Sequence, residues 1–187
     1  MLDAAKYEAT STLRNGRWVK VRALRPDDRT KLIEAVDRSS PESLYRRFVS
    51  PKRSFTDEEI AFFLNVDFVN HVALVALVEE NGRPTIVGGG RYIIVQPGRA
   101  EVAFAVVDAY HRQGIGAALM HHLVTIACGA GVKELIAEVL HENIAMLRVF
   151  QKSGLQLSKK KEAGIVQITM QLLASPGRCG ARRAREL

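Results

Sequence analysis

The sequence predicts a single α/β domain in which helices flank a mixed, mostly antiparallel sheet. The chain has 187 residues, which is enough for one domain and short for two. Its segments follow the order strand, helices, antiparallel meander, helix, strand, helix, strand. With 47% hydrophobic and 25% charged residues, the composition is that of a globular protein and excludes collagen-like, low-complexity and largely disordered classes.

The first part of the chain is predicted to form one strand and three helices. A short strand is expected at residues 18–24, followed by a helix from 26 to about 38, because acidic residues at a helix start suit the helix dipole. Ser40, which precedes a proline, predicts the N-cap of a second, short helix. Thr56 and Glu59 have the spacing of a capping box and predict a third helix.

The next three segments predict an antiparallel meander. Strands are expected at residues 71–79, 85–95 and 101–107, since each is rich in apolar and β-branched residues. Turn-forming residues separate them, Asn-Gly at 81–82 and Gln-Pro-Gly at 96–98.

The last part of the chain is predicted to alternate helices and strands. Apolar residues at helical spacing predict a long helix from 115 to 130, and Gly131 is a suitable C-cap. A strand at 133–140, a helix from 143 to about 153 and a strand at 165–172 complete the expected order.

The turn after the third meander strand is the most informative segment for function. A glycine-rich turn between a strand and a helix exposes backbone N–H groups at the positive end of the helix, which favours binding of phosphate. Gly114 and Gly116 let the backbone approach such a ligand closely. The triple glycine at 88–90 lies within a strand and predicts a bulge or bend.

The charge distribution separates the body of the chain from its ends. The net charge is +7, and residues 175–187 contribute +3 of it, from four arginines and one glutamate. We therefore expect an N-terminal extension at 1–17, a domain at 18–173 and a basic, disordered tail at 174–187. Nucleic acid is not an expected partner, because the sequence has no aromatic-and-basic stripe and no known nucleic-acid-binding motif.

Membrane and metal sites are also not expected. The longest apolar stretches, such as 72–78, fall short of the roughly 18–20 residues that cross a bilayer. Cys128 and Cys179 lack zinc-ligand spacing, while the neighbouring His121 and His122 point about 100° apart on a helix and suit structural roles. With no signal-peptide pattern in the sequence, we expect a cytoplasmic protein.

Two ordered motifs resemble the GNAT superfamily of N-acetyltransferases. The segment HRQGIG at 111–116 is similar to the acetyl-CoA pyrophosphate loop, and NIAMLRVFQKSGL at 143–155 resembles the second motif of that family. The segments VRALRPDD and SPESLYRRF are similar to the branch that contains bacterial protein-lysine acetyltransferases. The resemblance covers about residues 18–173.

This resemblance implies a GNAT fold, in which the sheet is splayed between the strand ending at Val107 and the strand ending at Leu140, with acetyl-CoA between them. It also implies a set of cofactor-binding residues. Backbone N–H groups of Gln113, Gly114, Ile115, Gly116 and Ala117 would hold the pyrophosphate, the backbone of Val106 and Val107 would bond the pantetheine, Arg112 and Lys152 would add charge, and Asn143 would contact the cofactor arm.

Two positions depart from the family pattern. His111 stands where the loop motif has Gln or Arg, which matters little if backbone groups bind the phosphates. Phe150 stands where many members carry a tyrosine that protonates the leaving thiolate. A thiol with a pKa of about 8.5 is nevertheless a fair leaving group near neutral pH.

Glu101 is the candidate general base. A lysine amine with a pKa of about 10.4 is almost wholly protonated at pH 7, so a base must remove a proton before the amine attacks. Glu101 begins the strand whose other end meets the loop, and the lysine-acetylating branch places a glutamate at the matching position. The alternative is a solvated glutamate at the edge of a strand.

The expected activity is acetyl transfer from acetyl-CoA to a primary amine, foremost a protein lysine side chain, by direct attack in a ternary complex. A small-molecule amine or amino acid is the alternative acceptor, and a non-catalytic acyl-CoA-binding module is the alternative function. Tyr45, Arg46 and Arg47 on the second helix fit either substrate recognition or a solvated helix face. The sequence leaves open whether the chain forms a homodimer.

Overall fold

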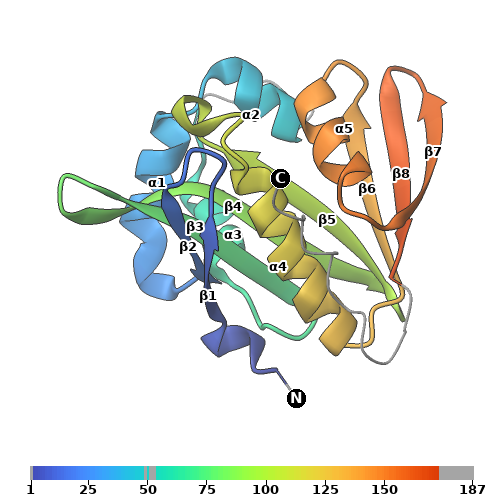
Figure 1. Cartoon of the computed structure of the whole chain (residues 1–187), viewed down its shortest axis with the longest axis horizontal. Coiled ribbons are helices and arrows are strands. Elements are labelled where there is room, and N and C mark those ends of the chain that lie inside the picture. Colours follow the sequence, from blue (N-terminus) through green and yellow to red (C-terminus); the bar gives the residue numbers. More distant parts are fainter. Residues whose placement is uncertain (1, 49, 51–53, 173–187) are drawn as a thin grey trace.

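A computed structural model describes residues 2–48, 50 and 54–172. Its eight strands form one sheet in the order β1-β2-β3-β4-β5-β6-β8-β7 (Figure 1). The strands are β1 Glu8–Thr12, β2 Trp18–Ala23, β3 His71–Glu80, β4 Arg83–Gln96, β5 Arg99–Val106, β6 Glu134–Leu140, β7 Gln156–Glu162 and β8 Ile165–Gln171. The α-helices are α1 Arg29–Asp37, α2 Pro41–Phe48, α3 Asp57–Leu64, α4 Ile115–Gly129 and α5 Ile144–Gln151. The basic tail expected at 174–187 lies outside the described residues.

The sheet is antiparallel except where β5 meets β6. These two strands are parallel, and they pair only from Arg99 with Glu134 to Glu101 with Ile136. Beyond this short ladder β6 leans away from β5, and α5 lies in front of the gap between the ribbons (Figure 1). The splayed sheet that the sequence resemblance implied is therefore confirmed.

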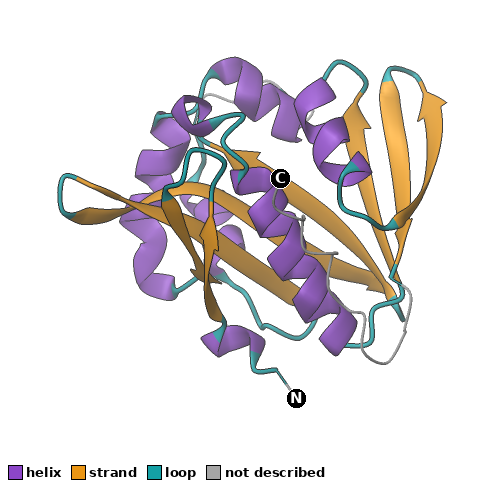
Figure 2. Ribbon diagram, in the orientation of Figure 1, coloured by secondary structure: helices purple, strands orange, loops and turns teal. Residues whose placement is uncertain are grey.

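Helices cover both faces of the sheet near its centre (Figure 2). The long helix α4 contacts β2 through β5 on one face, while α1 contacts β4 and α2 contacts β5. This double cover explains β3, in which the first eight residues are all buried. A strand covered on both faces has a continuous apolar sequence, because neither of its faces meets water. Among the described residues, none of the helices combines the length and the apolar character needed to span a bilayer.

The helix starts predicted from the sequence are confirmed. Ser40 Oγ accepts a hydrogen bond from the Ser43 N–H at 3.2 Å, which caps the first turn of α2. At α3, Thr56 Oγ1 accepts from the Glu59 N–H at 3.2 Å, and Glu59 Oε2 accepts from the Thr56 N–H at 3.0 Å. These three bonds satisfy backbone donors that have no partner within the helix.

Two edge strands have no counterpart in the sequence prediction. Strand β1 lies within the N-terminal segment 1–17 and pairs with β2, while β7 pairs with β8 at the opposite edge. The side chains on one face of β1 are exposed, and so are most side chains of β7, whose sequence QLSKKKE is polar. Such strands lack the apolar pattern that identifies buried ones.

The triple glycine of β4 comes directly after a bulge and packs closely against neighbouring side chains. The pairing of β3 with β4 shifts register between Ala76 and Leu77, which places the extra residue at Val87 and confirms the expected irregularity. A Cβ added at Gly90 would lie 2.7 Å from Cδ1 of Phe104 and 3.0 Å from Cδ1 of Leu123. Position 90 must therefore be glycine, because a Cβ there would collide with the Phe104 ring, which packs across from it on β5.

Replacing Gly90 with alanine is expected to destabilise the fold by roughly 1–3 kcal/mol, because the new methyl group forces the Phe104 ring to move within a packed core. The matched control is Gly129→Ala, since Gly129 is helical and a Cβ there meets nothing within 4 Å. That control is expected to be neutral or to stabilise by up to about 1 kcal/mol. Chemical denaturation measures both, and equal stabilities of the two variants would contradict the packing argument.

His122 of α4 joins the N-terminal segment to the rest of the fold. Its Nδ1 lies 2.6 Å from the Tyr7 hydroxyl, its Nε2 lies 2.9 Å from the Ser11 hydroxyl, and the residue is 6% exposed. Burial, with the charge of His121 as a smaller cause, lowers the pKa of His122 to about 4. The structural role expected from the sequence is confirmed, and the ring is neutral near pH 7.

This lowered pKa predicts a loss of stability in mild acid. The unfolded chain takes up a proton below pH 6.5 while folded His122 does not, so the free energy of unfolding is expected to fall by roughly 1–2 kcal/mol between pH 6.5 and 5. His122→Gln is expected to flatten this slope, and His121→Gln is expected to retain it. A wild-type slope in the His122 variant, measured by urea unfolding, would show that another group is responsible.

Candidate active site

The outer edge of β5 is open where β6 diverges. The Val107 N–H donates to Val87 O at 2.9 Å, which directs this backbone group toward β4. Because neighbouring residues of an antiparallel strand point their backbone groups in opposite directions, Phe104 and Val106 point theirs away from β4, toward β6. Since β6 pairs with β5 only as far as Glu101, these groups face the gap.

This geometry changes the backbone groups expected to meet the pantetheine. We expected Val106 and Val107, but the Val107 N–H is bonded to Val87 and the Val107 carbonyl accepts from the Tyr110 N–H at 2.9 Å. Val107 therefore has no free N–H for a ligand. The backbone of Phe104 faces the gap instead, as does that of Val106, whose carbonyl also accepts from His111 Nε2 at 2.8 Å. The sequence alone does not show that the backbone groups of Phe104 face the gap, because the direction of each residue's N–H and carbonyl can be assigned only once the partner strand is known.

The loop before α4 presents unpaired N–H groups. Arg112 and Gly114 adopt positive φ values of 63° and 101°, which turns the chain sharply into the helix. The first bond into α4 runs from the Ala118 N–H to Gly114 O at 3.0 Å, and no side chain caps the helix at Gly114. The N–H groups of residues 115–117 thus precede the helical ladder, and an anion can accept from them.

The turn between β1 and β2 braces this loop. The Arg14 N–H donates to Gln113 O at 3.2 Å, and Asn15 Nδ2 donates to Gln113 Oε1 at 3.1 Å. Gln113 in turn donates through Nε2 to Ala109 O at 3.0 Å. The side chain of Gln113 is therefore used to shape the loop. Sequence reasoning missed Arg14 and Asn15, since nothing in their local pattern shows that they reach a loop about a hundred residues away.

Helix α5 packs against the start of α4. A Cβ at Gly116 would lie 3.3 Å from Cγ2 of Val149, so this glycine permits close approach of the two helices. Asn143 caps α5, accepting from the Met146 N–H at 3.2 Å. Lys152 is the C-cap residue of α5, three residues after Val149, and is exposed.

Phe150 of α5 belongs to the core. It is 1% exposed, and its ring lies 5.9 Å from that of Phe104 on β5. The side chain therefore packs against β5 and offers no proton.

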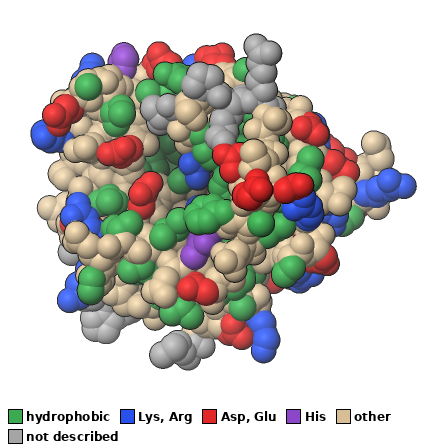
Figure 3. Space-filling view, turned by 180° about the vertical axis from the view of Figure 1, so that it is seen from behind, with side chains coloured by type: hydrophobic (Ala, Val, Ile, Leu, Met, Phe, Trp, Pro, Cys, Tyr) green, Lys and Arg blue, Asp and Glu red, His purple; other side chains and the backbone are tan. Residues whose placement is uncertain are grey.

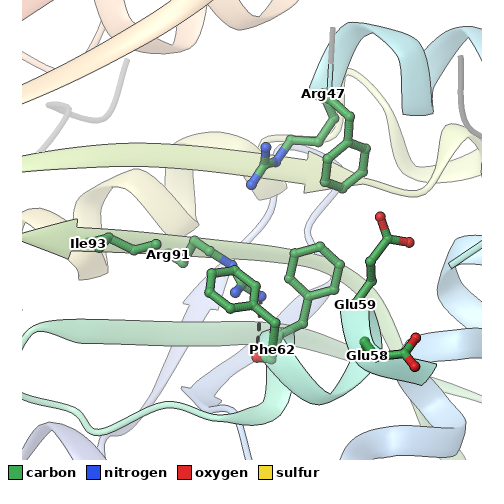
Figure 4. Close-up of a pocket in the computed structure, with 8 residues that line it drawn as sticks. Arg47, Glu58, Glu59, Phe62, Arg91 and Ile93 are labelled. Carbon is green, nitrogen blue, oxygen red and sulfur yellow. Dashed lines mark hydrogen bonds between the residues drawn. The ribbon is translucent and has the colours of Figure 1, made fainter. Parts of the chain in front are cut away.

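The opposite face of β5 borders a pocket. Glu101 pairs with Ile93 and Ala103 pairs with Arg91, so these four side chains share one face of the sheet. A pocket of about 430 Å³ lies on this face, and a basic side chain is visible among hydrophobic ones near its centre (Figure 3). The lining residues are Arg47, Phe48, Phe62, Phe63, Arg91 and Ile93, with Glu58 and Glu59 of α3 at one side (Figure 4).

The pocket places two guanidinium groups in a partly desolvated space. Burial lowers the pKa of Arg47, and the negative charge of Glu101 opposes this shift. Burial and the charge of Arg47 lower the pKa of Arg91 to about 10. His71 Nε2 accepts from Arg91 Nη1 at 3.0 Å, and burial with the charge of Arg91 lowers the pKa of His71.

Asp108 connects the pocket to the loop. It lies two residues after the end of β5 and accepts three hydrogen bonds at 2.8 Å, from the N–H and hydroxyl of Ser40 and from the hydroxyl of Ser43. Burial tends to raise the pKa of this carboxyl, but the bonds from Ser40 and Ser43 outweigh it and hold the pKa below its usual value. The anion at the start of α2 thus fixes the helix that carries Arg47 against the end of β5.

Gly114→Ala is expected to weaken coenzyme A binding at least tenfold, because a φ of 101° strains any residue with a Cβ and the loop must rearrange. Gly131→Ala is the matched control, since Gly131 also has a positive φ, 78°, but lies at the other end of α4. Both variants lose similar stability, and only the first loses affinity in a calorimetric titration. Equal affinities would place the diphosphate elsewhere.

Comparisons with known proteins agree with this geometry. Residues 37–155 match the Acetyltransferase (GNAT) family. The chain is 31% identical to Acetyltransferase PA5475 of Pseudomonas aeruginosa over 136 residues, which are 72% of this chain and 73% of that protein. It is 32% identical to Acetyltransferase Pat of Mycolicibacterium smegmatis over 76% of this chain, but it spans only 42% of that longer relative.

A solved structure shows the same fold. The GNAT domain of S. lividans PAT superposes with a TM-score of 0.80 at 31% identity, covering 88% of this chain and 96% of that domain. The open edge of β5 and the free N–H groups at the start of α4 suit the pantetheine and diphosphate of coenzyme A. The chain therefore belongs to the GNAT family of acetyltransferases, and acetyl-CoA is its cosubstrate.

Proposed function

We propose that the acceptor is the side-chain amine of a protein lysine, which attacks acetyl-CoA directly in a ternary complex with Glu101 as general base. The observation that supports this most is the position of Glu101. It is exposed on the face of β5 that borders the pocket, at the last residue where β5 pairs with β6. An amine reaching the gap from this face passes Glu101 on its way to a thioester held along the strand.

In this proposal the diphosphate accepts from the N–H groups of residues 113–117, and the pantetheine follows Phe104 and Val106. Arg112 and Lys152 add positive charge from the loop and from α5, and Asn143 lies beside the cofactor arm at the start of α5. The close packing of Gly116 against Val149 sets the position of α5 relative to these groups.

Starting from the lysine ammonium, the reaction removes two protons from the nitrogen and supplies one to the leaving sulfur. Glu101 takes the first proton, directly or through one water, and so releases the neutral amine. The amine nitrogen forms a bond to the acetyl carbon, the carbon–sulfur bond breaks, and the nitrogen loses its second proton to solvent. The thiolate leaves with the electron pair and takes a proton from solvent, since Phe150 has none to donate.

Glu101→Gln is expected to lower kcat by about a hundredfold or more, in the range of general-base contributions, while the affinity for acetyl-CoA stays unchanged. Activity in the variant should recover as the pH approaches the pKa of the free amine, about 10.4. Release of coenzyme A in the presence of a lysine peptide measures the rate.

Glu138→Gln is the control, because Glu138 is an exposed glutamate on the neighbouring strand β6 that pairs with Gln167. It is expected to retain wild-type kcat. If Glu101→Gln behaves like this control at neutral pH, another group is the base.

A further inference from the structure

Arg47 and Arg91 differ from the other arginines packed into this domain. Arg22, Arg38 and Arg46 each lie within 3 Å of a carboxylate oxygen, at 2.7, 2.9 and 2.5 Å. Within the described parts of the chain, no carboxylate lies within ion-pair distance of Arg47 or Arg91. The two guanidinium groups come from different elements, α2 and β4, and line one pocket (Figure 4).

Uncharged groups hold both side chains in place. The Arg47 guanidinium carbon lies 4.7 Å from the centre of the Phe48 ring, and that of Arg91 lies 4.6 Å from the centre of the Phe63 ring. Arg91 also donates through Nη1 to His71 and through Nη2 to Phe63 O at 3.5 Å. These contacts orient the guanidinium planes, and among the described residues they leave both groups without a carboxylate at ion-pair distance.

Two like charges in a half-buried pocket repel each other and have lost part of their hydration, which costs folding free energy. Burial lowers the pKa of Arg47, and burial together with the charge of Arg47 lowers the pKa of Arg91. A planar anion that accepts from both groups would remove the repulsion and form charge-assisted hydrogen bonds. Glu58 and Glu59 at one side of the pocket, and Glu101 beside it, favour a singly charged anion over a doubly charged phosphate monoester.

We infer that this pocket binds a carboxylate group of the acceptor, held by Arg47 and Arg91, and that this contact sets the reacting amine beside Glu101. The inference rests on the proposed function and specifies its acceptor. Arg91 and Glu101 are diagonal neighbours across β4 and β5, about 7–8 Å apart along the sheet. The carboxylate therefore comes from an acidic residue near the acceptor lysine in a protein, or from the α-carboxylate of a free amino acid.

The test measures binding of reaction products, so it does not depend on turnover. Short peptides with one Nε-acetyl-lysine and one glutamate, placed one to three residues away on either side, are compared by calorimetry with peptides carrying glutamine instead. Free Nε-acetyl-lysine is compared with its α-amide in the same way. The wild-type protein is expected to bind at least one acidic ligand about tenfold or more tightly than its neutral match. The series that shows this preference identifies the source of the carboxylate.

Arg47→Met and Arg91→Met are expected to reduce that ratio to about one, while Arg91→Lys keeps part of it. Arg46→Met is the matched control, since Arg46 lies on the same helix but pairs with Glu42, and it is expected to keep the full ratio. If Arg91→Met does not fold, the Arg47→Met variant is sufficient to test the inference.

No preference for acidic ligands in the wild type, or a preference that persists in Arg47→Met, would overturn the inference. Failure of the proposed function gives a different result. In that case the acidic peptides bind selectively, yet their unacetylated forms never release coenzyme A from acetyl-CoA.

Discussion

The early separation of β5 from β6 is the constraint on which the site depends. Three residue pairs hold the two halves of the sheet together, from Arg99 with Glu134 to Glu101 with Ile136. Past that point the backbone of Phe104 and Val106 faces a gap instead of a strand. Apart from the Val106 carbonyl, which accepts from His111, these groups have no strand to pair with, so this edge is suited to a ligand that carries its own amide groups, as pantetheine does. Family membership and this geometry both indicate acetyl-CoA as the cosubstrate.

Strand β5 divides the site into two sides. Phe104 points toward Phe150 of α5, on the side where α4 begins, while Glu101 and Ala103 border the pocket on the other side. Asp108 couples the two, because it follows β5 and anchors the start of α2 through Ser40. Arg47 lies near the far end of that helix. The position of the pocket is therefore set by residues that follow the end of β5.

Local signals were sufficient for much of the fold and for part of the site. The N-cap of α2, the capping box of α3, the alternating strand 101–107 and the loop before α4 depend on neighbours in sequence, so they could be predicted. Strands β1 and β7 could not, because edge strands carry no apolar pattern. The bracing of Gln113 by Asn15, and the pairing of Arg47 with Arg91 in one pocket, come from segments far apart in the chain. Only the tertiary arrangement joins them.

A crystal structure of the protein with bound acetyl-CoA tests this account most directly. We predict diphosphate oxygens within hydrogen-bond distance, about 2.7–3.2 Å, of N–H groups in residues 113–117. The pantetheine amides should pair with the backbone of Phe104 and Val106, and the acetyl group should face Glu101. Acetyl-CoA bound away from the gap between β5 and β6, or a β6 that closes against β5 with the ligand outside, would contradict it.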